Sequence, residues 1–239
     1  MGTCLLSRLP KPPSRSPLRT LAGHRLAGDR RKIFQVITDM SKYSEENLSR
    51  IGNAVIYIAE HTSDLSKTKL LKLLYLMEER SALKYQQPFL ALPFEVWQAG
   101  PVAKDIYIDL SDGAVLLSKY IRTELVKLDD NKDAQYIHPV AQFDDEDFSA
   151  YEIRLMDEVL KEYGDKTATE LVDIVHKENT LWYQIAKEKG LLDAFRKHEC
   201  NNSDYVIDFT KAMMPCAAEY YKEALAIHNA SNAYCSENV

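Results

Sequence analysis

Residues 66–84 carry apolar side chains around nearly the whole circumference of a helix, and this stretch constrains the fold most. Ser66 suits the N-cap position, where its hydroxyl accepts a hydrogen bond from the first turn. A surface helix keeps its apolar residues on one face, so a helix that is apolar all round belongs in the interior. We therefore predict a central buried helix, with Lys67, Lys69 and Lys72 on or near its exposed edge. The apolar residues are Leu70, Leu71, Leu73, Leu74, Leu76 and Met77.

Segments on either side of this helix predict further elements. A helical pattern begins after Ser44, which can cap it, and Phe94–Trp97 alternates like a short strand. Gly100 and Pro101 follow that strand. Glycine tolerates a turn and proline suits the first position of a helix, so we expect a strand-to-helix turn there and a helix over about 102–110.

The second half of the chain predicts a hairpin followed by helices. Residues 120–128 and 134–140 are rich in strand-forming side chains and flank a turn-forming cluster, which is typical of a hairpin. A last long helix is expected over about 205–230, kinked or started at Pro215. The prediction is a mainly α fold of the α+β type, a helical domain with a small antiparallel β-sheet or hairpin. Two capping boxes mark helix starts, Ser149 with Glu152 and Thr167 with Glu170.

The composition excludes several classes of protein and shows no signature of catalysis. No apolar run approaches the ~20 residues that span a bilayer, and the four cysteines lack C-x-x-C spacing, as expected of reduced thiols in a cytoplasmic protein. The pair His198 and Cys200 is too small for a metal site, and the acidic run Asp144–Asp147 lacks the spacing of a calcium loop. Known nucleotide-binding, protease and hydrolase motifs are missing. We therefore expect neither an enzyme nor a cofactor.

Charge is distributed unevenly along the chain. Residues 1–40 hold eight basic and two acidic residues, a net +6, whereas the remaining 199 residues hold 22 basic and 34 acidic ones, a net −12. The basic segment is rich in proline and serine, and we expect it to be mostly disordered. It could bind nucleic acid, serve as an organellar transit peptide, or extend the chain upstream of a natural start at Met40. We favour the last interpretation.

Three segments resemble the motifs of one known family, the Panacea-domain family of SocA-like antitoxins, also described as phage-associated proteins. The family motifs are an early K-L-x-K-L-L-Y helix, a central F-x-x-W-x-x-G-P-V with a following tyrosine, and a late E-L-x-x-x-x-H-x-E with a following tryptophan. The matching residues are Lys67–Leu76, then Phe94–Val102 with Tyr107, and finally Glu170–Glu178 with Trp182. The late motif departs from the family pattern at Val175 and Leu181, where the family usually has threonine and proline.

The resemblance implies a role in binding. Panacea domains pair with toxins of unrelated folds and neutralise them by direct contact, and at least one branch delivers its toxin to a protease. The resemblance also implies a Panacea-like domain over 41–230, between the basic extension 1–40 and a C-terminal tail 231–239. The leading hypothesis is a non-catalytic antitoxin whose partner is a protein toxin encoded by an adjacent gene. The alternative is a nucleic-acid-associated phage regulator that uses the basic arm.

The family motifs supply candidate site residues, each of which also has a structural explanation. Trp97 and Trp182 are large apolar groups that usually anchor a core, and Lys69 and Lys72 are expected to be solvated, although a cationic helix edge could meet an acidic partner. Three residues of the central motif are expected to have a structural role, namely Gly100, Pro101 and Val102. The candidate partner-binding residues are Lys69, Lys72, Tyr75, Trp97, Tyr107, His176 and Trp182.

Overall fold

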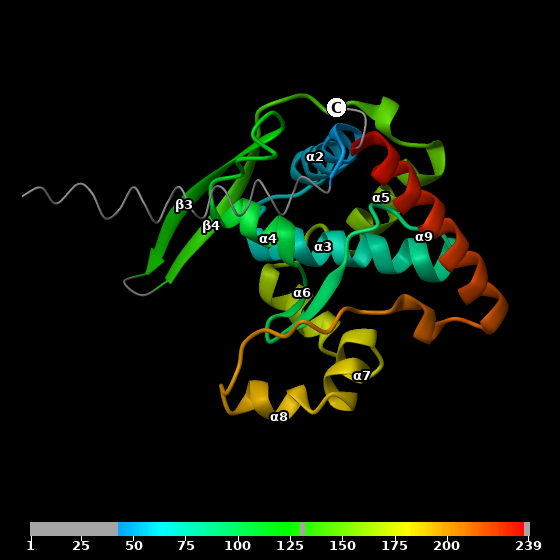
Figure 1. Ribbon diagram of the computed structural model, residues 1–239. Helices are drawn as coiled ribbons and strands as arrows, with labels where there is room; N and C mark the ends of the chain where they lie inside the picture. Colours follow the sequence, from blue (N-terminus) through cyan, green and yellow to red (C-terminus); the bar gives the residue numbers. More distant parts are fainter. Residues whose placement is uncertain (1–42, 130–131, 237–239) are drawn as a thin grey trace, which may run out of the picture.

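The computed structural model describes residues 43–129 and 132–236, which form a mainly α fold with two small antiparallel sheets of two strands each (Figure 1). The predicted fold class is confirmed. The basic segment 1–40 and the end of the tail lie outside the described residues. The elements are α2 Glu45–Glu60, α3 Lys67–Arg80, η1 Ser81–Tyr85, β1 Phe94–Trp97, β2 Gly100–Ala103, α4 Lys104–Ser111, β3 Ile121–Asp129, β4 Lys132–Pro139, η2 Asp145–Asp147, α5 Ala150–Tyr163, α6 Ala168–Val175, α7 Leu181–Glu188, α8 Leu191–Arg196, η3 Phe209–Ala212 and α9 Pro215–Ser236.

The central buried helix is α3. Ser66 caps it, accepting a hydrogen bond from the backbone N–H of Lys69 at 3.3 Å, and every residue from Lys69 to Glu78 is buried. The helix contacts α2, α4, α5, α6 and β2, so it organises the rest of the fold (Figure 1). The expected exposed edge is wrong for two of its three lysines, because Lys69 and Lys72 are only 4% and 1% exposed.

The chain from 94 to 111 is a hairpin and a helix, and it differs from the prediction at the turn. Phe94–Trp97 is the expected strand, but Gly100–Ala103 pairs with it as β2 instead of opening a helix, and α4 begins only at Lys104. Pro101 is therefore a strand residue, opposite Val96. The reversal occurs at Gln98 and Ala99, and Gly100 follows it with a φ of +96°.

The predicted helix over about 205–230 is shorter than expected. Residues 201–207 are extended and bond to β1 along its outer edge: Val96 N–H donates to the Tyr205 carbonyl at 2.9 Å, and Ile207 N–H donates to that of Phe94 at 2.7 Å. These bonds hold the backbone away from helical geometry. Helix α9 starts at Pro215, as in the second of the two predictions for this proline, a kink or a helix start.

The hairpin β3–β4 and the capped helices agree with the sequence. Strands β3 and β4 pair over 121–139 and project from the body of the domain (Figure 1). Both capping boxes are present, at the starts of α5 and α6. The short helix α8 was not predicted, and α9 continues to Ser236, so it includes six residues of the expected tail.

Candidate partner-binding site

The turn of the β1–β2 hairpin is the point at which most of the candidate residues meet. Gly100 lies so close to its neighbours that an added Cβ would stand 2.8 Å from Lys72 Cε on α3 and 2.9 Å from Val175 Cγ2 on α6. Its φ of +96° is in addition unfavourable for any residue with a side chain. Glycine is needed here for both reasons, and the hairpin thereby packs against two helices at once.

Lys72 is, with Tyr75, the most deeply buried of the candidates. Its Nζ donates to the Pro101 carbonyl oxygen at 2.8 Å, which ties α3 to β2. Burial lowers the pKa of this amine to about 7, because the charged form loses its hydration. The expectation that Lys72 is solvated is wrong, since the hairpin covers the lysine.

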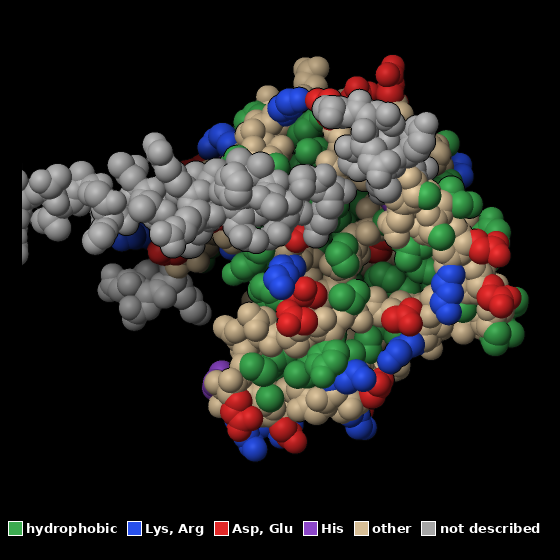
Figure 2. All heavy atoms as spheres, in the orientation of Figure 1, with side chains coloured by type: hydrophobic (Ala, Val, Ile, Leu, Met, Phe, Trp, Pro, Cys, Tyr) green, Lys and Arg blue, Asp and Glu red, His purple; other side chains and the backbone are tan. Residues whose placement is uncertain are grey.

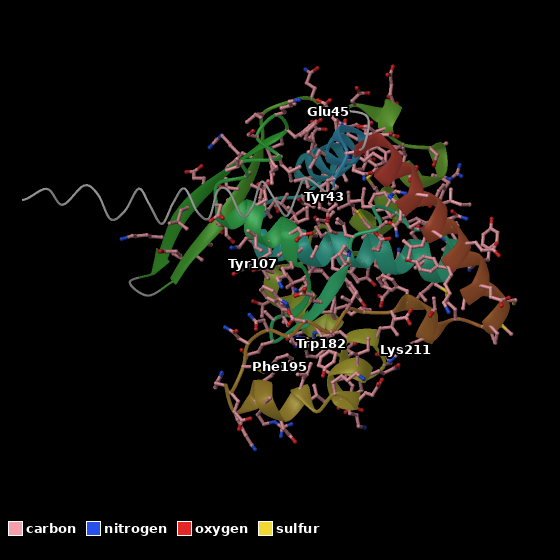
Figure 3. All side chains as sticks on the ribbon, in the orientation of Figure 1. Tyr43, Glu45, Tyr107, Trp182, Phe195 and Lys211 are labelled. Atoms are coloured by element: carbon pink, nitrogen blue, oxygen red, sulfur yellow. The ribbon has the colours of Figure 1, made fainter. Side chains whose placement is uncertain are left out.

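Trp97 and Tyr107 form a half-buried aromatic pair beside the turn. Their ring centres lie 5.0 Å apart at an interplanar angle of 64°, and Trp97 Nε1 donates to Glu95 Oε2 at 2.8 Å. Tyr107 lies on α4, near the N-terminal end of α3 (Figure 3). The Nζ of Lys67, at that end, lies 4.3 Å from the centre of the Tyr107 ring. This cation–π contact favours the charged amine, whereas burial lowers the pKa of Lys67.

His176 lies at the end of α6 and Trp182 lies on α7, and both helices contact the β1–β2 hairpin. Their rings stack at 4.0 Å, and Trp182 Nε1 donates to the Trp97 carbonyl oxygen at 3.0 Å. Nε2 of His176 is buried and has no hydrogen-bond partner among the described residues. Burial, and secondly the nearby charge of Lys72, lower the pKa of His176 to about 4. At neutral pH this histidine is therefore uncharged.

Two candidates do not belong to this cluster. Lys69 lies under the loop before α3, where its Nζ donates to the Ser63 carbonyl oxygen at 2.9 Å. The Tyr75 ring is fully buried, packs edge-on against Phe94 at 5.3 Å, and its hydroxyl donates to Glu79 Oε1 at 2.7 Å. Lys69, like Lys72, is buried instead of solvated.

A pocket of about 520 Å³ opens beside the hairpin turn. Its lining comes from the first turns of α3, the tip of the hairpin, α4 and the segment that follows α8. Among the candidates, Lys72, Trp97, Val102 and Tyr107 line it. The structure thus brings residues from separate parts of the sequence to one hollow.

Sequence reasoning missed several residues of this region. Lys67 was noted on the helix but not chosen for the site, and Asn201 and Asn202 line the pocket from a segment without any motif. The fully buried Glu78 was also missed; its carboxylate accepts from the backbone N–H groups of Phe89 and Leu90 at 2.9 Å each. A glutamate inside an apolar helix was the one local signal available for it.

The structure also bears on metal binding and membrane insertion. No group of three or more histidine, cysteine, aspartate or glutamate side chains among the described residues could hold a metal ion. Asp147, from the acidic run, is half-buried and accepts from Ser49 Oγ at 2.7 Å and Asn53 Nδ2 at 2.6 Å, so it fastens η2 to α2. In the part of the chain that is described, the helices are too short or too polar to cross a membrane.

Comparison with known families identifies the central part of the chain. Residues 70–183 match the family model described as antitoxin SocA-like, Panacea domain. The resemblance to the Panacea-domain family is confirmed. No curated protein and no solved structure matches the chain.

The Panacea match covers most of the cluster at the hairpin turn. Lys72, Trp97, Tyr107, His176 and Trp182 all fall within it. The list of pocket residues outside the match contains Lys67, Thr68, Asn201 and Asn202. The pocket is therefore built partly by the Panacea region and partly by flanking segments of this chain.

Proposed function

We propose that this chain is an antitoxin, which neutralises a cognate protein toxin by binding it and has no catalytic activity of its own. The observation that carries the proposal is the match of residues 70–183 to the Panacea domain of SocA-like antitoxins. The toxin is expected from a gene adjacent to that of this chain. A stable complex of this kind buries ~1,200–2,000 Å² of surface.

The burial of the candidate residues divides them by the role they can have in such a complex. Lys72, Tyr75 and Trp182 are at most 4% exposed, so they support the fold beneath a contact surface. Trp97 and Tyr107 are half-buried and line an open pocket, so they can meet a partner directly. Aromatic side chains of this kind supply much of the binding energy at protein interfaces.

The test is a toxicity-rescue assay. Each open reading frame next to the gene is expressed in a bacterial host with and without the full chain, and colonies are counted. We expect one neighbour to be toxic alone and to be tolerated together with this chain. Absence of toxicity from every neighbour, or toxicity that this chain does not relieve, would contradict the proposal.

Two substitutions then locate the contact surface. Tyr107→Ala removes an aromatic ring at the pocket, and we expect it to weaken toxin binding by about tenfold or more and to reduce rescue accordingly. Tyr220→Ala is the matched control, because Tyr220 is an exposed tyrosine on α9, 55% accessible. Both variants are first checked for unchanged thermal unfolding. Equal rescue by both would place the contact surface elsewhere.

A further inference from the structure

The pocket at the hairpin turn is lined by basic side chains, in contrast to the acidic chain around it. The basic side chains in its lining are Lys67 and Lys72, and no aspartate or glutamate of the described residues lines it. The second large hollow, about 590 Å³, shares Lys67 but is lined by Asp133 as well. The hollow near Arg50 is lined by two glutamates. Basic and acidic side chains also alternate over α7, α8 and α9 (Figure 2).

Helix α3 adds to the positive character of this pocket. Its first two residues, Lys67 and Thr68, are part of the lining, and the N-terminus of a helix carries the positive end of the macrodipole. The Lys72 amine has three N–H donors, and among the described residues the Pro101 carbonyl accepts one of them. An anion in the pocket would therefore meet Lys67 and the N-terminus of α3 directly, and it would favour the charged form of the Lys72 amine, which is buried beneath the turn.

The other walls of the pocket fit a flat ring. Trp97 and Tyr107, 5.0 Å apart, both contribute to the lining. Aromatic side chains bind planar heterocycles by stacking, and side-chain amides can pair with the polar edges of such rings. Amides are supplied by Gln98, Asn201 and Asn202. A volume of about 520 Å³ is within the range of small-molecule sites.

We propose that this pocket binds a small planar anion of the nucleotide type, with its anionic group at Lys67 and the N-terminus of α3, above the buried Lys72, and its ring against Trp97 and Tyr107. The proposal is independent of toxin binding, since it concerns the chain alone. A bound nucleotide would cover the face of the hairpin turn that Trp97 and Tyr107 form.

Binding is tested on the purified full chain by calorimetric titration with the four nucleoside 5′-monophosphates, adenosine and inorganic phosphate. We expect at least one monophosphate to bind, and to bind about tenfold or more tightly than either adenosine or phosphate, because each of these lacks half of the contacts. Binding should weaken with added salt, as for any charge-dominated contact. No binding by any monophosphate at 5 mM would overturn the proposal.

Matched variants locate the site. Lys67→Ala should weaken binding of the best monophosphate by about tenfold, since a charge-assisted contact is lost. Lys84→Ala is the control, because Lys84 also lies over a tyrosine ring, that of Tyr85 at 5.0 Å, but lines a different hollow. Tyr107→Leu should weaken binding by about fivefold or more through lost stacking. Equal affinity of Lys67→Ala and Lys84→Ala would contradict the assignment.

Discussion

The β1–β2 hairpin is buried in the domain, whereas the β3–β4 hairpin projects from it (Figure 1). Every residue of β2 is buried, and the hairpin is held by Lys72, by Trp182 and by the extended segment 201–207. By contrast, β3 exposes Leu125 and Leu128, at 67% and 54%. Both hairpins are antiparallel, although β3–β4 has a register shift between Lys127 and Asp129, and they differ most in what surrounds them.

The comparison shows where sequence variation should be costly. A strand that is covered on both sides and along one edge tolerates neither added volume nor a missing hydrogen bond. A hairpin whose outer side chains lie in water can change that outer surface freely. The β3–β4 hairpin is anchored by the buried Ile121 and Ile137, by the bond from Ile137 N–H to the Leu65 carbonyl at 2.9 Å, and by the bond from Gln135 Nε2 to the Leu110 carbonyl at 2.5 Å.

The largest effect is expected for Gly100→Ala, compared with Gly113→Ala. Both glycines have a φ of +96°, but Gly113 has no atom within 4 Å of an added Cβ, whereas Gly100 meets Lys72 and Val175. We expect Gly113→Ala to cost about 1 kcal/mol of unfolding free energy and Gly100→Ala about 3 kcal/mol, measured by urea denaturation. Equal costs would show that the contacts at Gly100 relax freely.

The next effect depends on pH and concerns Lys72→Met. The pKa of the buried amine is about 7, below that of lysine in the unfolded chain, near 10.5. Between these values the unfolded chain binds more protons, so the natural protein gains stability as the pH rises. The Lys72→Met variant lacks this dependence. From pH 7 to pH 9, its free energy of unfolding should therefore fall by about 2 kcal/mol relative to that of the natural protein.

Lys84→Met is the control for this experiment. The Lys84 amine is exposed and pairs with Glu158 at 2.7 Å, so burial contributes nothing comparable to its titration. Urea denaturation at pH 7, 8 and 9 should show a constant difference between Lys84→Met and the natural protein. A difference that is just as constant for Lys72→Met would mean that its amine stays charged in the folded state.

Lys72 also illustrates how far the sequence predicts the structure. Helix α3, its cap, both capping boxes and the β3–β4 hairpin follow from local patterns, and all were predicted. The burial of Lys72 depends on the hairpin that covers it, some 29 residues later in the chain. A lysine among leucines has the same local pattern at a surface as in an interior, so the usual preference for exposure gave the wrong answer.

The candidate site was predictable only in part, because some of its residues meet through contacts between distant segments. The family motifs placed Trp97, Tyr107 and Lys72 in one set, and the structure brings these three to the pocket. Asn201 and Asn202 reach it because residues 201–207 bond to β1, a contact between distant segments. Short extended stretches without alternation carry no signal of such pairing, and α8 is too short to show a helical period.

A smaller effect is expected for His176→Phe. The pKa of His176 is about 4 in the folded chain and near 6.5 in the unfolded one, so the natural protein loses stability as the pH falls through this range. Phenylalanine keeps the stacking on Trp182 and removes the buried, unpartnered Nε2. Between pH 6.5 and pH 5, the natural protein should therefore lose about 1 kcal/mol more of its unfolding free energy than the variant does. This figure allows for solvent screening of the partly exposed ring.

Urea denaturation at the two pH values measures this difference, and an NMR titration of the natural protein follows the His176 ring directly. A ring that titrates near its usual pKa, together with parallel pH profiles for both proteins, would show that solvent reaches His176. The buried environment on this side of the hairpin would then be looser than the stacked geometry indicates.

The smallest effect is expected at the projecting hairpin. Replacing Leu125 and Leu128 together by serine removes side chains that are already mostly in water, so the unfolding free energy should change by less than about 0.5 kcal/mol. Val96→Ser in β1 is the matched contrast, because Val96 is fully buried and a hydroxyl there would lack a partner; we expect a cost of about 3 kcal/mol. Thermal and urea unfolding measure both variants. A loss above about 1 kcal/mol for the leucine pair would mean that the outer half of β3–β4 contributes to folding, which would weaken the distinction between the two hairpins.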